Sequence, residues 1–115
     1  RFQQQRVTRM YKFKSKAAGD VIMMGPAGDD VLRRIGKPVA AQGIIEVAAM
    51  PAAIAAIEQA VSDDETARAQ AEKEAVAEGK TLAPREGVTL RQRAWLLVEM
   101  MKRSMAEKAD IVWGV

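Results

Sequence analysis

The spacing of the apolar residues changes several times along this chain of 115 residues, and that limits the folds open to it. Over residues 11–16, Tyr11, Phe13 and Ser15 alternate with lysines, which is the period of a half-buried strand. Over residues 89–105 they recur at steps of three and four, which is the period of a helix with one apolar face. A chain that passes between these two periods is neither a helical bundle nor an all-strand barrel.

A β-hairpin is predicted at the start of the patterned region. Tyr11, Phe13 and Ser15 share one face of its first strand, and the lysines share the other. Residues 17–20 have the composition of a turn, in which Gly19 can adopt a positive φ. Residues 21–24 are apolar on both faces, so we expect the second strand to be more deeply buried than the first.

A short helix should follow the hairpin. The Gly-Pro-Ala-Gly sequence at residues 25–28 is expected to break the second strand as a turn. Asp29 and Asp30 then favour a helix N-terminus, because acidic groups stabilise that end of the helix dipole. Gly36 should end this helix.

The middle of the chain predicts a strand and two helices. Residues 43–47 are β-branched and predict a third short strand, and residues 50–61 carry apolar side chains at helical spacing. Ser62 begins a capping-box pattern, so a separate helix is expected from there to about residue 78. Because that helix has almost no large apolar side chain to bury, we expect a solvated helical or linker insert at about residues 63–87.

The C-terminal part completes the predicted fold. Thr89 opens a second capping box and the principal core helix, and residues 111–115 should form a fourth strand. The predicted class is α+β: a small mixed or antiparallel sheet, made of the hairpin plus two further strands, with helices packed on one face. Residues 10–115 are expected to form this single domain.

Positive charge is concentrated at the N-terminus. The whole chain has a net charge of +3, and residues 1–16 hold six basic side chains and no acidic one. Residues 1–9 have no apolar periodicity, and Met10 would make a natural start. We therefore expect residues 1–9 to be a basic tail that is disordered or non-native.

The composition excludes several kinds of chemistry. The sequence contains neither Cys nor His, so it has no disulfide, no thiolate or imidazole metal ligand and no Ser-His or Cys-His catalytic pair. We predict no metal site, no cofactor and no enzymatic activity. No uncharged apolar stretch reaches the roughly 18 residues that span a bilayer, and no export signal follows the basic residues, so we expect a cytoplasmic protein without a membrane partner.

Three stretches of the sequence are distinctive: MYKFKSKAAGDVIMM at residues 10–24, GIIEVAAMPAAIAAIEQAV at residues 43–61, and TLRQRAWLLVEMMKRS followed by ADIVWG within residues 89–114. They resemble a family of short proteobacterial proteins catalogued as a domain of unknown function. The FKSKAAGDVIM block and the final WG carry most of the resemblance. Because that family has no assigned activity, the resemblance implies one compact domain and supplies no catalytic residue.

The first candidate site is the row of three lysines on one strand face, Lys12, Lys14 and Lys16. Ammonium groups about 7 Å apart along a strand would be able to follow a phosphate backbone. The other interpretation is a solvated face whose lysines prevent edge pairing. We favour the second, because Tyr11 and Phe13, on which bases would stack, lie on the opposite face.

Two acidic clusters, at residues 29–30 and 63–65, are the candidate carboxylate sites. Adjacent residues on a helix point about 100° apart, so neither cluster converges on a metal ion or a reacting bond. We interpret both as helix caps. The glycines of residues 25–28 precede a helix as in phosphate-binding turns, but no Lys-Ser or Lys-Thr completes a P-loop.

Tryptophan and methionine supply the candidate protein interface. Trp95 and Trp113 are interpreted first as core anchors and second as anchors for a partner. Methionines occur as adjacent pairs at residues 23–24 and 100–101, and we expect at least one member of each pair to face away from the core. The candidate interface residues are Met23, Met24, Trp95, Met100 and Trp113.

These features together predict a non-catalytic protein–protein interaction or self-associating module. The expected partner is a second copy of the chain or another protein. The strand at residues 21–24 is apolar on both faces, so its apolar surface is larger than one small domain can bury. Weak binding of nucleic acid or another polyanion through Lys12, Lys14 and Lys16 is the alternative.

Overall fold

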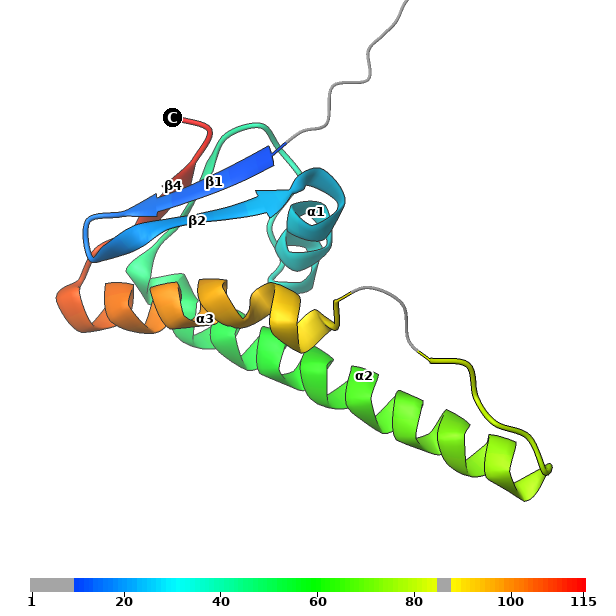
Figure 1. Cartoon of the computed structure of the whole chain (residues 1–115). Coiled ribbons are helices and arrows are strands. Elements are labelled where there is room, and N and C mark those ends of the chain that lie inside the picture. The colour runs from blue at the N-terminus through cyan, green and yellow to red at the C-terminus, as the bar shows by residue number, and fades with distance from the viewer. Residues whose placement is uncertain (1–9, 85–87) are drawn as a thin grey trace, which may run out of the picture.

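The structure, a computed structural model, describes residues 10–84 and 88–115, so the predicted basic tail lies outside the described residues. Within them a four-stranded antiparallel sheet packs against three α-helices, which confirms the α+β class (Figure 1). The strand order β2-β1-β4-β3 pairs the first strand with the last at the centre of the sheet. In chain order the elements are β1 (Met10–Ser15), β2 (Ala18–Met24), α1 (Gly25–Arg34), β3 (Gly43–Ile45), the short 3-10 helix η2 (Val47–Ala49), α2 (Met50–Ala77), α3 (Leu90–Glu107) and β4 (Ile111–Trp113).

β1 and β2 form the predicted hairpin, but its turn is tighter than expected. The connection consists of Lys16 and Ala17, and β2 already begins at Ala18. Gly19 therefore lies within the strand and does not adopt a positive φ. The pairing of β1 with β2 shifts register between Phe13 and Ser15, which is a β-bulge. β2 therefore extends through residues for which a turn was predicted.

The inner face of the sheet carries the aromatic part of the core. Tyr11 and Phe13 stack with ring centroids 5.9 Å apart, and Phe13 meets Trp113 edge to face at 5.7 Å. All three helices contribute apolar side chains to the core on this side of the sheet. The buried apolar residues of the helices are Val31, Leu32, Met50, Ala53, Ile54, Ile57, Val61, Leu90, Ala94, Leu97, Val98, Met100 and Met101.

The outer face of the sheet has no layer of described structure over it. Figure 1 shows α2 and α3 on the inner side and α1 at the end of the hairpin. Alternate residues of β2 consequently reach the solvent: Ile22 is 57% exposed and Met24 is 50% exposed. The expectation that β2 is the more buried strand is therefore wrong, because only one of its two apolar faces has a partner layer.

α1 starts directly after β2, so residues 25–28 are its first turn and not a separate turn as predicted. Pro26 fits there because the first turn of a helix leaves its N–H groups without intrahelical partners. A Cβ on Gly28 would lie 2.1 Å from the Tyr11 ring, so glycine is what lets α1 approach β1. Asp29 accordingly lies in the second turn, where it accepts a hydrogen bond from the Tyr11 hydroxyl instead of capping the helix.

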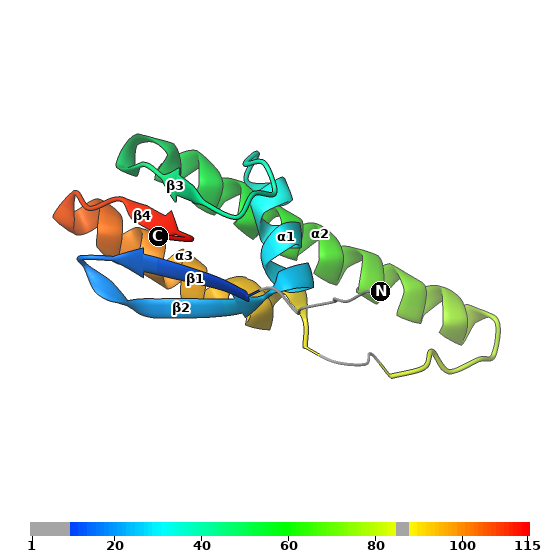
Figure 2. The ribbon, with the colours of Figure 1, turned by 90° about the horizontal axis from the view of Figure 1, so that it is seen from above.

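α2 is one helix of 28 residues, so the separate helix predicted from Ser62 is wrong. No Gly or Pro interrupts the sequence between Ala52 and Glu78, and the high helix propensity of its Ala and Glu residues carries the helix through the capping pattern. The buried residues of α2 end at Val61. The turns beyond it project from the body of the molecule (Figures 1 and 2).

α3 begins with the predicted capping box and is the principal core helix. The Thr89 hydroxyl accepts from the Gln92 N–H at 3.1 Å, and the Gln92 side chain accepts from the Thr89 N–H at 2.9 Å. Ser104 is the one fully buried polar side chain among the described residues, and its hydroxyl bonds to that of Ser15 at 2.9 Å. This hydrogen bond fastens the turn end of the hairpin to the helix.

The three α-helices end in the same way. Gly36, Gly79 and Lys108 follow α1, α2 and α3 with φ of 81°, 74° and 56°. In each case the next residue donates its N–H to a carbonyl five positions back, at 2.7 to 2.9 Å, as in a Schellman motif. The stop predicted at Gly36 is confirmed, and Lys108 is the non-glycine residue in this role.

Candidate interaction surface

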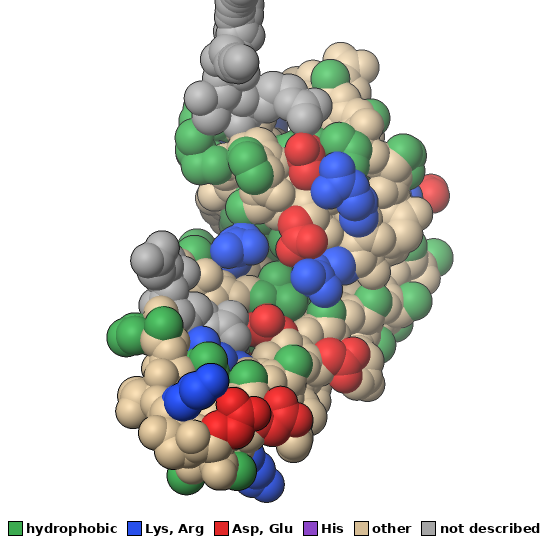
Figure 3. Space-filling model, turned by 90° about the vertical axis from the view of Figure 1, so that its right-hand side faces the viewer, with side chains coloured by type: hydrophobic (Ala, Val, Ile, Leu, Met, Phe, Trp, Pro, Cys, Tyr) green, Lys and Arg blue, Asp and Glu red, His purple; other side chains and the backbone are tan. Residues whose placement is uncertain are grey.

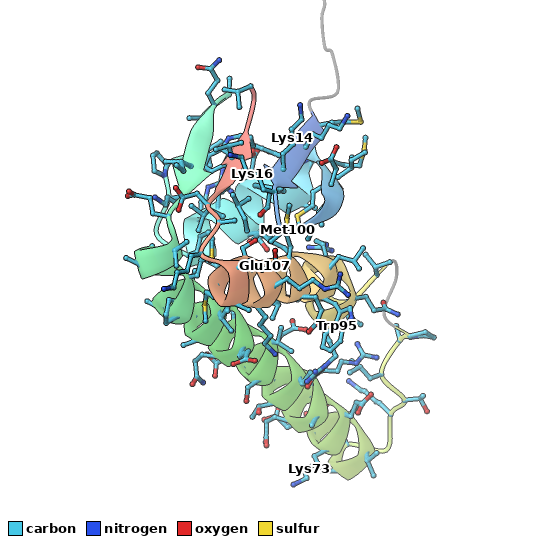
Figure 4. The ribbon with its side chains drawn as sticks, turned by 90° about the vertical axis from the view of Figure 1, so that its left-hand side faces the viewer. Lys14, Lys16, Lys73, Trp95, Met100 and Glu107 are labelled. Atoms are coloured by element: carbon cyan, nitrogen blue, oxygen red, sulfur yellow. The ribbon has the colours of Figure 1, made fainter. Side chains whose placement is uncertain are left out.

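The structure divides the five candidate interface residues into two groups. Met23, Met100 and Trp113 are buried in the core and present no surface to a partner. Met24 and Trp95 are about half exposed, at 50% and 51%. Met24 lies on the outer face of the sheet, whereas Figure 4 shows Trp95 on the side of α3 next to α2. The predicted residues are therefore not brought together as one surface.

The core interpretation holds for Trp113 and is wrong for Trp95. The Trp113 indole N–H donates to the Ala40 carbonyl at 2.9 Å, which satisfies its polar group inside the core. α3 is covered by the sheet on one side and by α2 on the adjacent side, and Trp95 lies on the margin of that covered arc. The same wide arc buries both Met100 and Met101, so the expectation that one of this pair faces outward is also wrong.

Trp95 flanks a groove of about 260 Å³ between α2 and α3. Arg91 stands at the groove with its guanidinium held by both oxygens of Glu65, at 2.8 and 2.9 Å. This hydrogen bonding, together with the attraction of the carboxylate charge, raises the pKa of Arg91 above its ordinary value. The remaining lining is mainly apolar: Ile57, Val61, Ala94 and Val98, with Glu58. The groove is a mainly apolar cleft whose cation, Arg91, is already paired.

The outer face of the sheet combines apolar side chains with lysines. Met10 is 62% exposed and lies opposite the half-exposed Met24, and Ile22 precedes Met24 by two residues on β2. We call Met10, Ile22 and Met24 the hairpin patch. Lys12 lies opposite Ile22 and forms an ion pair with Asp20 at 3.6 Å. The patch is therefore apolar, with charged groups immediately beside it.

The three lysines of the predicted row do not form a continuous positive surface. Lys14 donates to the main-chain oxygen of Val115 at 3.0 Å, and Lys16 belongs to the hairpin turn instead of the strand. Both line an open depression of about 620 Å³ that also contains Glu107 and Asp110 (Figure 4). Because acidic groups stand beside these lysines, the surface lacks the unbroken positive charge that a phosphate backbone requires.

The acidic residues lie within helices rather than at their N-termini, which corrects their interpretation as caps. Asp30 accepts from Arg34 at 2.9 Å and Asp63 from Gln59 at 2.9 Å, each one helical turn away. Figure 3 shows red and blue side chains next to each other on the face that includes the projecting end of α2. In the part of the chain that the structure describes, no group of three or more acidic residues is placed to hold a metal ion, and no helix is long and apolar enough to cross a membrane.

Sequence reasoning missed a second exposed surface, beside the edge of the sheet. β2 is an edge strand, and Leu96 of α3 is 62% exposed below it. Leu96, Glu99 and Arg103 line an open depression of about 330 Å³ together with residues 18–21 of β2. The available signal was the run Trp95-Leu96-Leu97-Val98, since four consecutive large apolar residues cannot all face the interior of one helix.

The model of a protein family described as "Domain of unknown function (DUF1840)" matches residues 9–113. The match therefore extends over all strands and helices of the described fold. No curated protein and no solved structure matches the chain.

Proposed function

We propose that this chain, which belongs to the DUF1840 family of domains of unknown function, is a non-catalytic module that binds another protein. The observation that carries the proposal is the hairpin patch on the uncovered face of the sheet. Single exposed apolar side chains are ordinary, but grouped ones are typical of interaction surfaces. The register of the hairpin places Met10 directly opposite Met24, so the three side chains of the patch are neighbours.

Covering this patch is energetically worthwhile. Full burial of a Met or Ile side chain is worth about 1.5–3 kcal/mol, and each side chain of the patch is already half covered. A partner would therefore gain roughly 1 kcal/mol from each, or about 3 kcal/mol in all. That gain is enough to anchor an interface that other contacts complete.

The charges beside the patch indicate the kind of surface that fits it. Lys12 and Lys14 stand on the same face as the patch, and Asp20 pairs only with Lys12. The patch is thus apolar, and the charged side chains of β1 beside it, Lys12 and Lys14, are positive. The complementary partner is a protein with exposed apolar side chains and acidic groups around them.

The arrangement of the ionisable groups supports a binding role over a catalytic one. The ion pairs of the helices, such as Arg34 with Asp30 and Arg91 with Glu65, lie at exposed surfaces. Reaction chemistry needs titratable groups that converge on one position in a cleft. The groove beside Trp95 has a mainly apolar lining with Arg91 and Glu58, and the Arg91 guanidinium is held by Glu65.

Site-specific photo-crosslinking tests the proposal. A photoreactive amino acid is introduced at Ile22 in the patch or, as a matched control, at Val76, which is 74% exposed on the projecting end of α2. In cells that express the chain, we expect one discrete protein adduct from position 22 and none from position 76. Excess unlabelled chain should compete for the adduct, and its Met24→Lys variant should not. Equal labelling from both positions, or competition by Met24→Lys, would contradict the proposal.

A further inference from the structure

β2 is a long edge strand whose one charged residue, Asp20, is paired with Lys12. It has seven residues, the largest number among the four described strands, whereas β3 at the other edge has three. Native edge strands are commonly short or carry Lys or Pro, because their free N–H and C=O groups invite pairing with another chain. The sequence AGDVIMM contains neither residue. Figure 2 shows no described element alongside the outer edge of β2.

A flank of α3 lies beneath this free edge. Leu96, Glu99 and Arg103 follow one another at helical spacing and share a depression with the start of β2. Ala94 and Val98, which line the groove with α2, lie on the opposite side of the helix. The exposed Leu96 side chain therefore points away from α2 and out past the edge of the sheet.

Strand and helix run in opposite directions at this edge. Figure 1 shows β2 running towards α1 while α3 runs the other way. Of the residues that share the depression, Val21 is the last on β2 and Leu96 is the first on α3, so these two lie at the same end of it. Val21 is also the middle residue of β2. The centre of the free strand and the exposed leucine thus lie next to one another.

A two-fold axis at this position makes the surface complementary to itself. If a second copy pairs antiparallel with β2 about Val21, all seven residues of both strands take part, from Ala18 opposite Met24 onwards. The same axis lays the two α3 flanks antiparallel, with Leu96 against Leu96 of the second copy. The pairing satisfies the free edge groups and covers the leucines in one step.

The charges on α3 match the same axis. Arg93 and Glu99 stand three residues on either side of Leu96. An antiparallel pair of helices centred on Leu96 therefore sets Arg93 of each copy opposite Glu99 of the other, twice in the dimer. Within the described part of one chain, both groups have exposed contacts: Arg93 donates to the Val88 carbonyl at 3.2 Å, and Glu99 lies 3.9 Å from Lys102. Both are free to turn to a new partner.

We propose that two copies of the chain associate through β2, forming one eight-stranded antiparallel sheet with Leu96 and the Arg93–Glu99 pairs at the two-fold axis. This inference goes beyond the proposed function, because it uses the edge of the sheet instead of the hairpin patch and commits to one partner. The outer faces of the two sheets remain open, so both copies keep their hairpin patch available.

Sedimentation equilibrium of the full chain over a wide concentration range tests the dimer by charge exchange. The wild-type chain should reach twice its mass of 12.6 kDa. Glu99→Arg and Arg93→Glu each set like charges opposite one another at two places, and each should weaken dimerisation about tenfold. The double variant exchanges the two charges and should restore the wild-type affinity. Leu96→Lys should leave a monomer, and Val76→Lys, on the distant end of α2, should change nothing.

Each other outcome counts against the dimer. A chain that stays monomeric at the highest concentration overturns it, and so does a dimer that neither Leu96→Lys nor the single charge variants weaken. The substituted side chains are at least partly exposed, and far-UV circular dichroism with thermal unfolding verifies that every variant folds. Ile22 lies on β2, so its adduct is identified by mass: an adduct with a second copy of the chain reports on the dimer, and an adduct with a different protein reports on the hairpin patch. Failure of the dimer and failure of the proposed function are therefore distinguishable.

Discussion

Gly43 faces Trp113 where β3 pairs with β4, and replacing it with alanine should destabilise the fold by about 2–3 kcal/mol. An alanine Cβ there would lie 2.2 Å from Cζ2 and 2.3 Å from Cη2 of the indole ring. Non-bonded carbon atoms are attractive only near 3.5–4.0 Å, so the ring or the strand has to move by more than 1 Å.

The magnitude follows from what holds the ring. In an unobstructed strand, Gly→Ala would stabilise by roughly 0.5–1 kcal/mol, because glycine loses more backbone entropy on folding. At Gly43 the Trp113 ring is buried, contacts Phe13 edge to face and donates its N–H to the Ala40 carbonyl. Overpacking of a core costs about 1–3 kcal/mol, and moving the ring far enough to lose its hydrogen bond costs about 1 kcal/mol more. These costs exceed the entropic gain.

Urea unfolding followed by far-UV circular dichroism measures the change, with the m-value expected to stay constant. Gly19→Ala is the control, because nothing lies within 4 Å of its added Cβ and its φ is not positive. That variant should be neutral or slightly more stable. In a Trp113→Phe background, which lacks the outer indole ring, Gly43→Ala should cost clearly less. Equal costs in both backgrounds, or a Gly43→Ala variant as stable as the wild type, would refute this account of the packing.

Three further predictions concern the helix ends and the buried serines. Lys108→Gly should raise the free energy of unfolding by about 0.5–1 kcal/mol, because φ of 56° strains any residue with a Cβ; a loss of stability in the same urea assay would argue against a strained C-terminus. Ser15→Ala should lower the free energy of unfolding by about 1–2 kcal/mol, because it leaves the buried Ser104 hydroxyl without its partner. Ser104→Ala should lower it by less than about 1 kcal/mol. A larger loss for Ser104→Ala than for Ser15→Ala would contradict the burial of Ser104. Amide hydrogen exchange should be slow at residues 53–61 of α2 and much faster at residues 66–77, which contain no buried side chain, and uniform protection would show that the projecting turns are packed.

Local signals in the sequence predicted the elements that depend on neighbouring residues. The alternation at Tyr11 and Phe13 gave the correct inner face of β1, and the capping box at Thr89 gave the correct start of α3. Both patterns are complete within a few residues. Ser62 shows where a local signal fails: the capping pattern was present, but the surrounding residues favour helix on both sides, so the chain had no reason to break there.

Features of the surface depend on which elements become neighbours in the fold. Local sequence patterns do not show which elements these are. Trp95 lies on an apolar arc of α3, yet its exposure is decided by where α2 and the sheet end. The two apolar faces of residues 21–24 did indicate more apolar surface than one domain covers, and Met24 is half exposed. The free edge of β2, in contrast, follows from the strand order, which joins β1 to a strand about a hundred residues away.

The projecting half of α2 is an unbroken continuation of the part of the helix that packs in the core. At 1.5 Å per residue, the helix extends about 24 Å beyond Val61, its last buried side chain. The same unbroken helix holds Ile57 in the core. A force applied at the C-terminal end of α2 would therefore be transmitted to the core without a break in the helix. The Arg91–Glu65 pair bridges α3 to the base of this arm, so a force on the arm would load this pair directly.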